Sequence, residues 1–294
     1  MKLSCTPISL ARELKSGAMD LRGFVDFCAE QGIDGVDLLD TKCYPWLWEG
    51  PATDLKTAAR HIEQAGLGLA AYACGNNFAL GDPAAHDQQV EVVKSAVREA
   101  AEAGAPVLRI FGGHLNGPDG RVPPHAGMRL VKAGIEKCLP EAEKHGVVLA
   151  LENHGALPGH AFELAALFRT FNSPWLRCTF DCANFIAWNM PEAEDPVRAL
   201  ETLLPWLAHV HVKDMVRVPI ATDAGLGWAK VAGQGHVPIK QLTAITESSG
   251  YDGYYSLEYE AAHEVPEREG VAESFRYLKE VSLLHEELGL NSSR

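Results

Sequence analysis

The segment HAGMRLVKAGIEKCLPEAEKHGVVLALENHG (125–155) contains one complete unit of the predicted fold. Its first part has the apolar spacing of an amphipathic helix, which ends at Gly146 and which we expect Pro140 to kink or split. The apolar strand VVLAL follows and stops at Glu152. A strand that is apolar on both faces is typical of a sheet covered by helices. The segment therefore predicts a helix, a buried strand and a carboxylate at the end of that strand.

The same unit recurs along the whole chain. We predict amphipathic helices at residues 20–32, 53–66, 86–104, 125–146, 160–171, 237–250 and 273–289. Eight apolar strands end at intervals of 29 to 47 residues, near Cys5, Leu39, Ala73, Phe111, Glu152, Asp181, His211 and Glu258. A strand–helix unit needs about 30 residues, so eight of them without a Pro-, Ser- or Gly-rich linker predict one (β/α)8 TIM barrel over residues 1–294.

A doubly wound open sheet is the alternative fold. That fold usually carries a Gly-rich phosphate-binding turn after its first strand. Here the corresponding segment reads CTPISLA (5–11) and contains no glycine. The sequence therefore favours the barrel.

The composition excludes several classes of partner. The 294 residues include 39 Asp and Glu and 26 Lys and Arg, which gives a formal net charge of −13. Such a surface repels phosphate groups, so we expect neither nucleic acid nor an anionic membrane as a partner. The opening MKLSCTPISL does not resemble a signal peptide, and no apolar run approaches the roughly 18 residues of a membrane helix.

The cysteines indicate a reducing compartment. Seven cysteines are scattered along the chain, an odd number with no disulfide framework, so we predict a cytoplasmic protein with free thiols. Cys178 and Cys182 have the spacing of zinc ligands, but no second pair accompanies them. A structural zinc site is therefore not expected.

Four consecutive predicted strands end in residues that can bind a metal ion. They are Glu152 in LALENHG, Asp181 in CTFDCAN, His211 in HVHVKD and Glu258 in YSLEYE. Active sites of TIM barrels lie at the carboxyl ends of the strands. Any one of these residues alone is more often a helix cap, a surface charge or a core histidine, but four at the same end favour a site. Three carboxylates and one imidazole suit one divalent metal ion, with Mn²⁺ expected first and Mg²⁺, Co²⁺ or Zn²⁺ as alternatives.

Alternation along the strands distinguishes these residues from their neighbours. His209 shares a face with His211 but lies deeper, so we expect it to line the barrel. Glu258 ends the apolar run YYSL, whereas Glu260 is expected in the following loop. His211 and Glu258 are therefore the predicted ligands.

These segments, with the opening LSCTPISL and the second strand GIDGVDL, resemble the xylose isomerase-like barrel family over essentially the whole chain. That family includes tagatose and psicose 3-epimerases, hydroxypyruvate isomerase, inosose dehydratase and the endonuclease IV branch. The resemblance implies that Glu152, Asp181, His211 and Glu258 hold the metal. It also implies that Glu152 and Glu258 are catalytic and shuttle a proton through a metal-stabilised enediolate. We therefore expect a divalent-metal-dependent isomerase or epimerase acting on a sugar, a polyol or a keto acid.

Other residues near the strand ends are candidates for substrate binding. For Arg109, the alternative to binding substrate is an ion pair with a carboxylate. For Lys213, the alternative is a structural pair with Asp214 at the start of a loop. Epimerases of this family have a histidine three residues after the aspartate ligand, where this chain has Asn184. The predicted substrate-binding set is His154, Asn184, Arg109, Asn77, Lys213 and His114.

Two further features lie in predicted loops. GQGH (233–236) resembles a Gly-rich loop of the family but lacks its acidic residue. Four tryptophans are candidates for a wall against a sugar ring, for closing the site or for a contact within a homo-oligomer: Trp46, Trp48, Trp188 and Trp228.

Three alternative functions use the same sequence features differently. A dehydratase or lyase acting on a keto-sugar or keto-inositol would begin with the same proton abstraction and then expel a hydroxyl group. A barrel that binds sugar without catalysis would have little reason to bury four metal-ligand side chains. An endonuclease IV-type nuclease needs additional histidines and a basic surface, whereas this chain is acidic.

Overall fold

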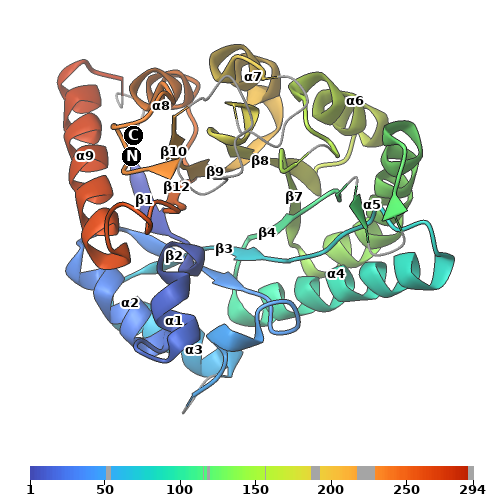
Figure 1. The fold of residues 1–294 in the computed structure, drawn as a ribbon, viewed down its shortest axis with the longest axis horizontal. Helices are drawn as coiled ribbons and strands as arrows, with labels where there is room; N and C mark the ends of the chain where they lie inside the picture. The colour runs from blue at the N-terminus through green and yellow to red at the C-terminus, as the bar shows by residue number, and fades with distance from the viewer. Residues whose placement is uncertain are drawn as a thin grey trace.

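Eight parallel strands close into a barrel, as the sequence predicts (Figure 1). The structure is a computed structural model that describes residues 1–50, 54–114, 116–117, 120–155, 157–186, 193–216 and 229–290. Going round the barrel, the strands are β1 (Lys2–Cys5), β2 (Gly35–Leu39), β3 (Gly68–Ala73), β4 (Val107–Ile110), β7 (Val148–Glu152), β8 (Leu176–Asp181), β9 (Leu207–Val212) and β12 (Tyr254–Leu257). Pairing of β1 with both β12 and β2 closes the ring. The chain is a (β/α)8 TIM barrel.

Helices surround the ring of strands on its outer side (Figure 1). They are α1 (Ala11–Ser16), α2 (Leu21–Glu30), α3 (Leu55–Gln64), α4 (Pro83–Ala103), α5 (Pro124–His145), α6 (Ala161–Phe171), α7 (Pro196–Leu203), α8 (Ile239–Ser248) and α9 (Glu267–Glu287). All seven predicted helices are present, whereas α1 and α7 were not predicted. Both are short, and α7 offers only eight residues of apolar periodicity.

The expected split of α5 at Pro140 does not occur, because the helix is continuous from Pro124 to His145. Proline removes the hydrogen bond to the carbonyl four residues earlier, which belongs to Glu136. Both Pro140 and Glu136 are exposed, so water can solvate that carbonyl. Gly146 then ends the helix in the left-handed conformation, with φ of 67°.

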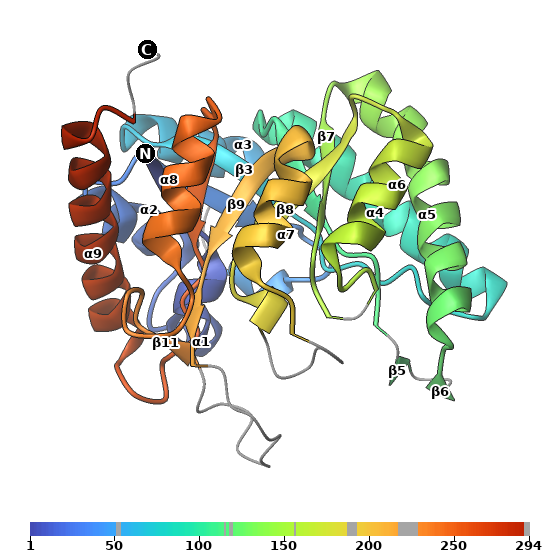
Figure 2. The ribbon, with the colours of Figure 1, turned by 90° about the horizontal axis from the view of Figure 1, so that it is seen from above.

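The strand register places the predicted site residues at one end of the barrel. Asp181 pairs with His211 across β8 and β9, and His211 pairs with Ser256 across β9 and β12. Glu152 is the last residue of β7, and Glu258 directly follows β12. In Figure 2 the short strands β5 (Asn116–Gly117), β6 (Gly120–Arg121) and β11 (Ala229–Lys230) lie at the end of the molecule opposite the N-terminus.

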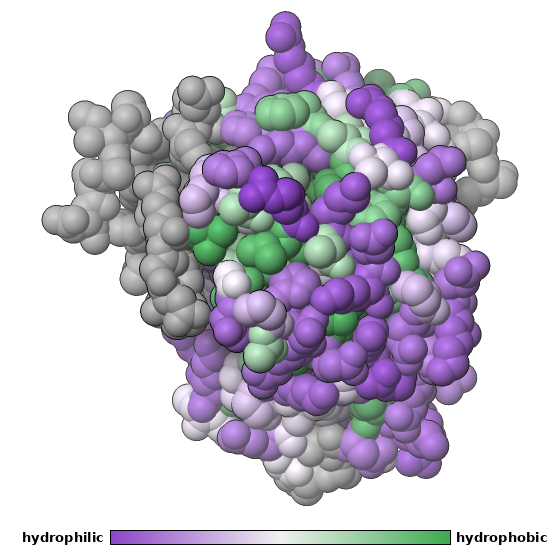
Figure 3. All heavy atoms as spheres, turned by 90° about the vertical axis from the view of Figure 1, so that its right-hand side faces the viewer, coloured by the Kyte–Doolittle hydropathy of each residue, from purple (hydrophilic) through white to green (hydrophobic). Residues whose placement is uncertain are grey.

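The outer surface is hydrophilic where the helices face water. On the side formed by α4, α5 and α6, hydrophilic side chains predominate around a small group of hydrophobic ones (Figure 3). Amphipathic helices give this distribution, because one face packs on the barrel and the other is solvated. Among the described residues, no helix is long and apolar enough to cross a membrane.

Close packing of α5 on the loop after β3 gives a first prediction. A Cβ atom at Gly134 would lie 2.4 Å from the ring of Phe78, which is fully buried. We expect Gly134→Ala to lower the free energy of unfolding by about 1–2 kcal/mol, because overpacking outweighs the gain in helix propensity. Gly23→Ala in α2 is the control, since the added Cβ there meets only flexible Met19 and Asp20 side chains. Urea unfolding of both variants tests this, and an unchanged or more stable Gly134→Ala would contradict it.

Candidate metal centre

The structure brings the four predicted metal ligands together at the mouth of the barrel. One donor atom each from Glu152, Asp181, His211 and Glu258 lies within 4.8 Å of all the others. His211 Nδ1 is 3.0 Å from Glu258 Oε2 and 3.7 Å from Glu152 Oε2. Glu258 is partly exposed and the other three are buried. The cluster therefore opens to solvent on the side of Glu258.

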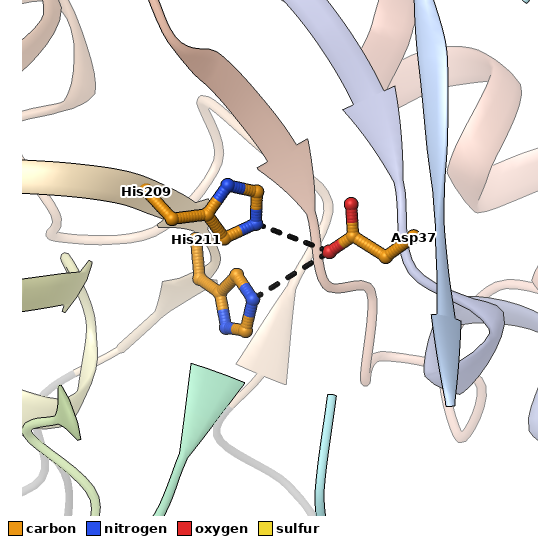
Figure 4. Close-up of side chains that lie close together, drawn as sticks. All are labelled: Asp37, His209 and His211. Carbon is orange, nitrogen blue, oxygen red and sulfur yellow. Dashed lines mark hydrogen bonds and ion pairs between the residues drawn. The ribbon is translucent and has the colours of Figure 1, made fainter. Parts of the chain in front are cut away.

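Asp37 of β2 lies beneath this cluster, and the sequence analysis did not assign it a role. Figure 4 shows His209 and His211 of β9 pointing to the same Asp37 oxygen, at 3.1 Å and 3.8 Å from their Nε2 atoms. Ser256 Oγ also donates to this oxygen at 2.9 Å. His211 therefore directs Nε2 towards Asp37 and Nδ1 towards the carboxylate cluster. The sequence signal that could have identified Asp37 is a single charged residue within the otherwise apolar strand GVDLL.

The charges of this group shift the pKa values of Asp37 and His211. Burial raises the pKa of Asp37, but the charge and hydrogen bond of His209 outweigh it and hold the pKa at about 2. Burial lowers the pKa of His211, but the Asp37 and Glu258 carboxylates outweigh it and raise the pKa to about 10. Asp37 is therefore a carboxylate whose negative charge stabilises the imidazoles above it.

Lys213 extends into the cluster from the end of β9. Its Nζ lies 3.0 Å from Glu258 Oε1 and 3.2 Å from Asp181 Oδ2. Glu260 Oε2 is 3.5 Å away, so this glutamate in the loop after β12 also contacts the lysine. Burial lowers the pKa of Lys213, but Asp181 and Glu258 raise it well above its ordinary value. The ammonium group thus offsets part of the negative charge of the cluster.

The neighbouring Asp214 has a structural role. Its carboxylate accepts hydrogen bonds from the backbone N–H groups of Gly233 and Gly235, both at 2.8 Å, and of Val237 at 3.1 Å. A Cβ atom at Gly235 would lie 2.1 Å from Asp214 Oδ1. GQGH (233–236) is therefore glycine-rich because its backbone wraps around a buried carboxylate. Lys213 and Asp214 do not act as a pair.

Arg109 of β4 pairs with the first predicted ligand. Its Nε lies 3.3 Å from Glu152 Oε2, and its Nη1 donates to the carbonyl of Cys74 at 2.9 Å. The guanidinium carbon lies 3.9 Å from the centre of the Phe111 ring. Burial lowers the pKa of Arg109, but Tyr44 and Glu152 outweigh it and raise the pKa. Arg109 therefore orients the Glu152 carboxylate.

Asn184 and His154 also lie beside the cluster. Asn184 Nδ2 donates to Glu152 Oε1 at 3.0 Å. The ring of His154 packs against Phe111, with centroids 4.3 Å apart, and His114 is 5.6 Å from it. Burial, with the positive charges of Lys213 and Arg109, lowers the pKa of His154 to about 3, so its imidazole is neutral. Its Nδ1 is buried and has no hydrogen-bond partner among the described residues.

Asn77 and the tryptophans organise loops. Asn77 Oδ1 accepts from the backbone N–H groups of Ala79 at 3.0 Å and His114 at 3.2 Å. Trp48 Nε1 donates to the carbonyl of Leu39 at 2.9 Å. The ring of Trp46 contacts that of Tyr44 edge to face, with centroids 6.1 Å apart. The remaining two predicted wall residues, Trp188 and Trp228, lie outside the described residues.

The donor atoms of the cluster fit a divalent cation. Asp181 Oδ1 accepts from the N–H groups of Ala183 and Asn184. Asp181 Oδ2 and His211 Nδ1 have no geometric hydrogen bond in the described parts of the chain, and their close contacts are ion pairs with Lys213 at 3.2 Å and Glu258 at 3.0 Å. Converging carboxylates in a largely buried site are unfavourable unless positive charge offsets them, and Lys213 and Arg109 supply only part of that charge. Three oxygens and one nitrogen suit a hard or borderline divalent ion. Glu152, Asp181, His211 and Glu258 could therefore hold one.

Comparison with known proteins identifies the family. The model of the xylose isomerase-like TIM barrel family matches residues 25–281, so the chain belongs to that family. The predicted family and fold are thus confirmed.

Individual relatives are more distant. A segment of 126 residues is 34% identical to YihM of Escherichia coli K12, over 41% of this chain and 36% of YihM, so the match spans about a third of that relative. The structure of protein SMc04130 from Sinorhizobium meliloti 1021 is 22% identical, covers 95% of this chain and 98% of that chain, and gives a TM-score of 0.75. D-Psicose 3-epimerase from Clostridium cellulolyticum H10, solved with D-tagatose, is 13% identical over 96% and 99% of the two chains, with a TM-score of 0.72.

The buried Asp37 charge gives a prediction on stability. Because the pKa of Asp37 is about 2 in the folded protein, its charge stabilises the fold above about pH 4, and this contribution is lost as the pH falls towards 2. We expect Asp37→Asn to lower the free energy of unfolding by about 2–4 kcal/mol at pH 7, with a smaller difference from the wild type at pH 3.

Urea unfolding at several pH values measures this difference. Asp34→Asn is the control, because Asp34 is exposed directly before the same strand and an asparagine oxygen can still accept its hydrogen bond from the Leu3 N–H, so the change should cost less than about 1 kcal/mol. A difference between Asp37→Asn and the wild type that widens on acidification would show that the charge of Asp37 does not stabilise the fold.

Proposed function

We propose that this protein is a divalent-metal-dependent isomerase or epimerase of an uncharged sugar or related polyol. The observation that carries the proposal is the convergence of Glu152, Asp181, His211 and Glu258 at the barrel mouth, with donor atoms within 4.8 Å of one another. Membership of the xylose isomerase-like family, and the likeness to a D-psicose 3-epimerase, support this class of reaction.

The chain supplies the groups that such a reaction needs. A divalent cation held by the four residues would polarise a substrate carbonyl and its neighbouring hydroxyl, which acidifies the C–H bond between them. Glu152 and Glu258 are the two carboxylates that we assign to proton transfer. They come from β7 and from the end of β12, which are separated in the barrel wall by β8 and β9. One carboxylate can remove the proton, and the other can return it from a different direction.

Fixed contacts orient both carboxylates. Glu152 is held by Arg109 at 3.3 Å and by the Asn184 amide at 3.0 Å. Glu258 is held by Lys213 at 3.0 Å on one oxygen and by His211 at 3.0 Å on the other. Carboxylates restrained in this way lose little orientational freedom when a proton is transferred.

The charge of the site favours an uncharged substrate. Four carboxylates meet there, Glu152, Asp181, Glu258 and Glu260, opposed by the positive Arg109 and Lys213. An imidazole that binds a cation gives up the proton on the ligating nitrogen, so His211 counts as neutral in the loaded site. The sum is then −2, which a divalent ion would bring to zero. An anionic keto acid or sugar phosphate would leave an uncompensated charge in a largely buried site. His154, whose Nδ1 has no hydrogen-bond partner in the part of the chain that the structure describes, is the residue that we assign to binding a substrate hydroxyl.

The metal content of the purified, untagged protein tests the site. By inductively coupled plasma mass spectrometry, we expect about one Mn, Co, Mg or Zn ion per chain in the wild type and its loss in both Glu152→Gln and His211→Ala. Glu267→Gln is the matched control, since Glu267 is also a buried carboxylate but belongs to none of the candidate metal-binding groups among the described residues, and it should retain the metal. If the wild type holds no metal even after incubation with Mn²⁺, the four-ligand site is wrong and a non-catalytic sugar-binding barrel is favoured.

Turnover of a panel of aldoses and ketoses tests the chemistry. On a substrate that the wild type converts with Mn²⁺, we expect Glu258→Gln to lower kcat by about 10²-fold or more, since it removes a proton-transfer group. The exposed Glu63→Gln should retain wild-type turnover. Unchanged turnover in Glu258→Gln would contradict the proposed mechanism. Loss of water without interconversion of sugars would identify a dehydratase or lyase instead.

A further inference from the structure

A second side-chain cluster lies at the barrel mouth, at the ends of β2 and β3. Donor atoms of Asp40, Cys43 and Cys74 all lie within 4.8 Å of one another. Cys74 directly follows β3 and is buried, whereas Cys43 lies in the turn after β2 and is partly exposed. The two strands are paired up to Leu39 and Ala73, so their next residues are held side by side. The thiols are thus 31 residues apart in sequence but adjacent in space.

The Asp40 carboxylate accepts hydrogen bonds from three backbone N–H groups. Its Oδ1 accepts from the N–H groups of Lys42 at 3.0 Å and Cys43 at 2.8 Å, and its Oδ2 accepts from Gly75 at 3.1 Å. These bonds tie the turn that carries Cys43 to the segment that carries Cys74. Asp40 therefore holds the two thiols together, which argues against a metal site made of these three residues.

The absence of a side chain at Gly75 allows the close approach. A Cβ atom there would lie 2.8 Å from the Cβ of Cys43, closer than real Cβ contacts. Cys43 thus packs directly on the backbone next to Cys74. The two sulfurs lie within 4.8 Å of each other, and the interaction between the thiols lowers the pKa of Cys43 and raises that of Cys74. This arrangement pairs an accessible, more nucleophilic thiol with a buried partner.

We propose that Cys43 and Cys74 form a reactive dithiol that a peroxide converts reversibly to a disulfide. The Cys43 thiolate attacks one oxygen of hydrogen peroxide, the O–O bond breaks, and the released hydroxide takes a proton to become water. The sulfur of Cys74, losing its proton, then attacks the Cys43 sulfenic acid, and its hydroxyl leaves as a second water. Two thiols lose two electrons in total, and one peroxide is reduced to two waters.

The dithiol adjoins the residues that position Glu152. The carbonyl of Cys74 accepts a hydrogen bond from Arg109 Nη1 at 2.9 Å, and Arg109 also interacts electrostatically with Tyr44, the residue after Cys43. Arg109 in turn pairs with Glu152. A disulfide here would constrain both neighbours of Arg109, so the site is placed to affect the cluster described above. The oxidation itself does not depend on the proposed function.

The chain contains an internal control for thiol proximity. Cys5 and Cys28 are also an interacting pair of thiols, but both side chains are fully buried, and burial raises the pKa of Cys28 well above its ordinary value. Proximity is therefore common to both pairs, whereas the partial exposure of one member is specific to the pair that contains Cys43. Peroxide should distinguish them in the native protein.

The test treats the reduced, folded protein with a few equivalents of hydrogen peroxide, then alkylates it in denaturant and maps the peptides by mass spectrometry. We expect a loss of about 2 Da per chain, a peptide linked through Cys43 and Cys74, full alkylation of the remaining cysteines, and reversal by dithiothreitol. Cys43→Ser should abolish the linkage, Cys74→Ser should stop at a sulfenic acid that dimedone traps at Cys43, and Cys28→Ser should leave the linkage unchanged.

Three results would overturn the proposal: no mass loss in the wild type, a linkage between Cys5 and Cys28 in place of the proposed one, or retention of about one zinc ion that depends on Cys43 and Cys74. Because the decisive measurement is made on the wild type, it does not rely on the folding of a variant. Because it reports thiols rather than turnover, its failure is distinct from failure of the proposed sugar isomerase activity.

Discussion

Closure of the parallel barrel is the constraint on which the rest of this structure depends. Once β1 pairs with both β2 and β12, all eight strands point the same way and their carboxyl ends form one ring. Residues as far apart in the chain as Asp37 and His209 are then held 3.1 Å apart. Every loop that follows a strand begins at this ring, so polar residues at strand ends become neighbours irrespective of their spacing in sequence. The concentration of carboxylates at the mouth is a direct consequence.

The negative charge of these carboxylates needs positive charge nearby, and the barrel places charged groups of alternating sign at successive depths. Arg109 and Lys213 contact the carboxylates from the sides, and both are buried. Beneath them, the negative Asp37 stabilises His209 and His211. Charges that alternate in sign over short distances reduce the cost of removing each from water, whereas an isolated one would be strongly destabilising. The mouth is thus organised by buried charge as much as by apolar packing.

The sequence predicted the framework well because strand ends and helix spacing are local signals. All eight strand ends fall within one residue of the positions predicted from apolar runs. It did not reveal α7, which is short, or the exposed setting of Glu136 that lets α5 continue through Pro140. It also did not reveal Asp37, because pairing across the barrel depends on which strands face each other. The Cys43–Cys74 contact likewise depends on the β2–β3 register.

Strand-end carboxylates look alike in a sequence, but their backbone contacts separate them into two kinds. Asp40 and Asp214 accept hydrogen bonds from several backbone N–H groups each, so their charge is used to fold loops. Asp181 is intermediate, with Oδ1 engaged by the backbone and Oδ2 directed into the cluster. Glu152 and Glu258 are instead held by side chains. Asp40 accepts three and Asp214 four backbone hydrogen bonds, whereas Glu152 and Glu258 each have two side-chain contacts within 3.3 Å, so more of their lone pairs remain for a cation or a proton. This difference, which depends on the turn that follows each strand, is why Glu152 and Glu258 are the strand-end carboxylates that we assign to proton transfer.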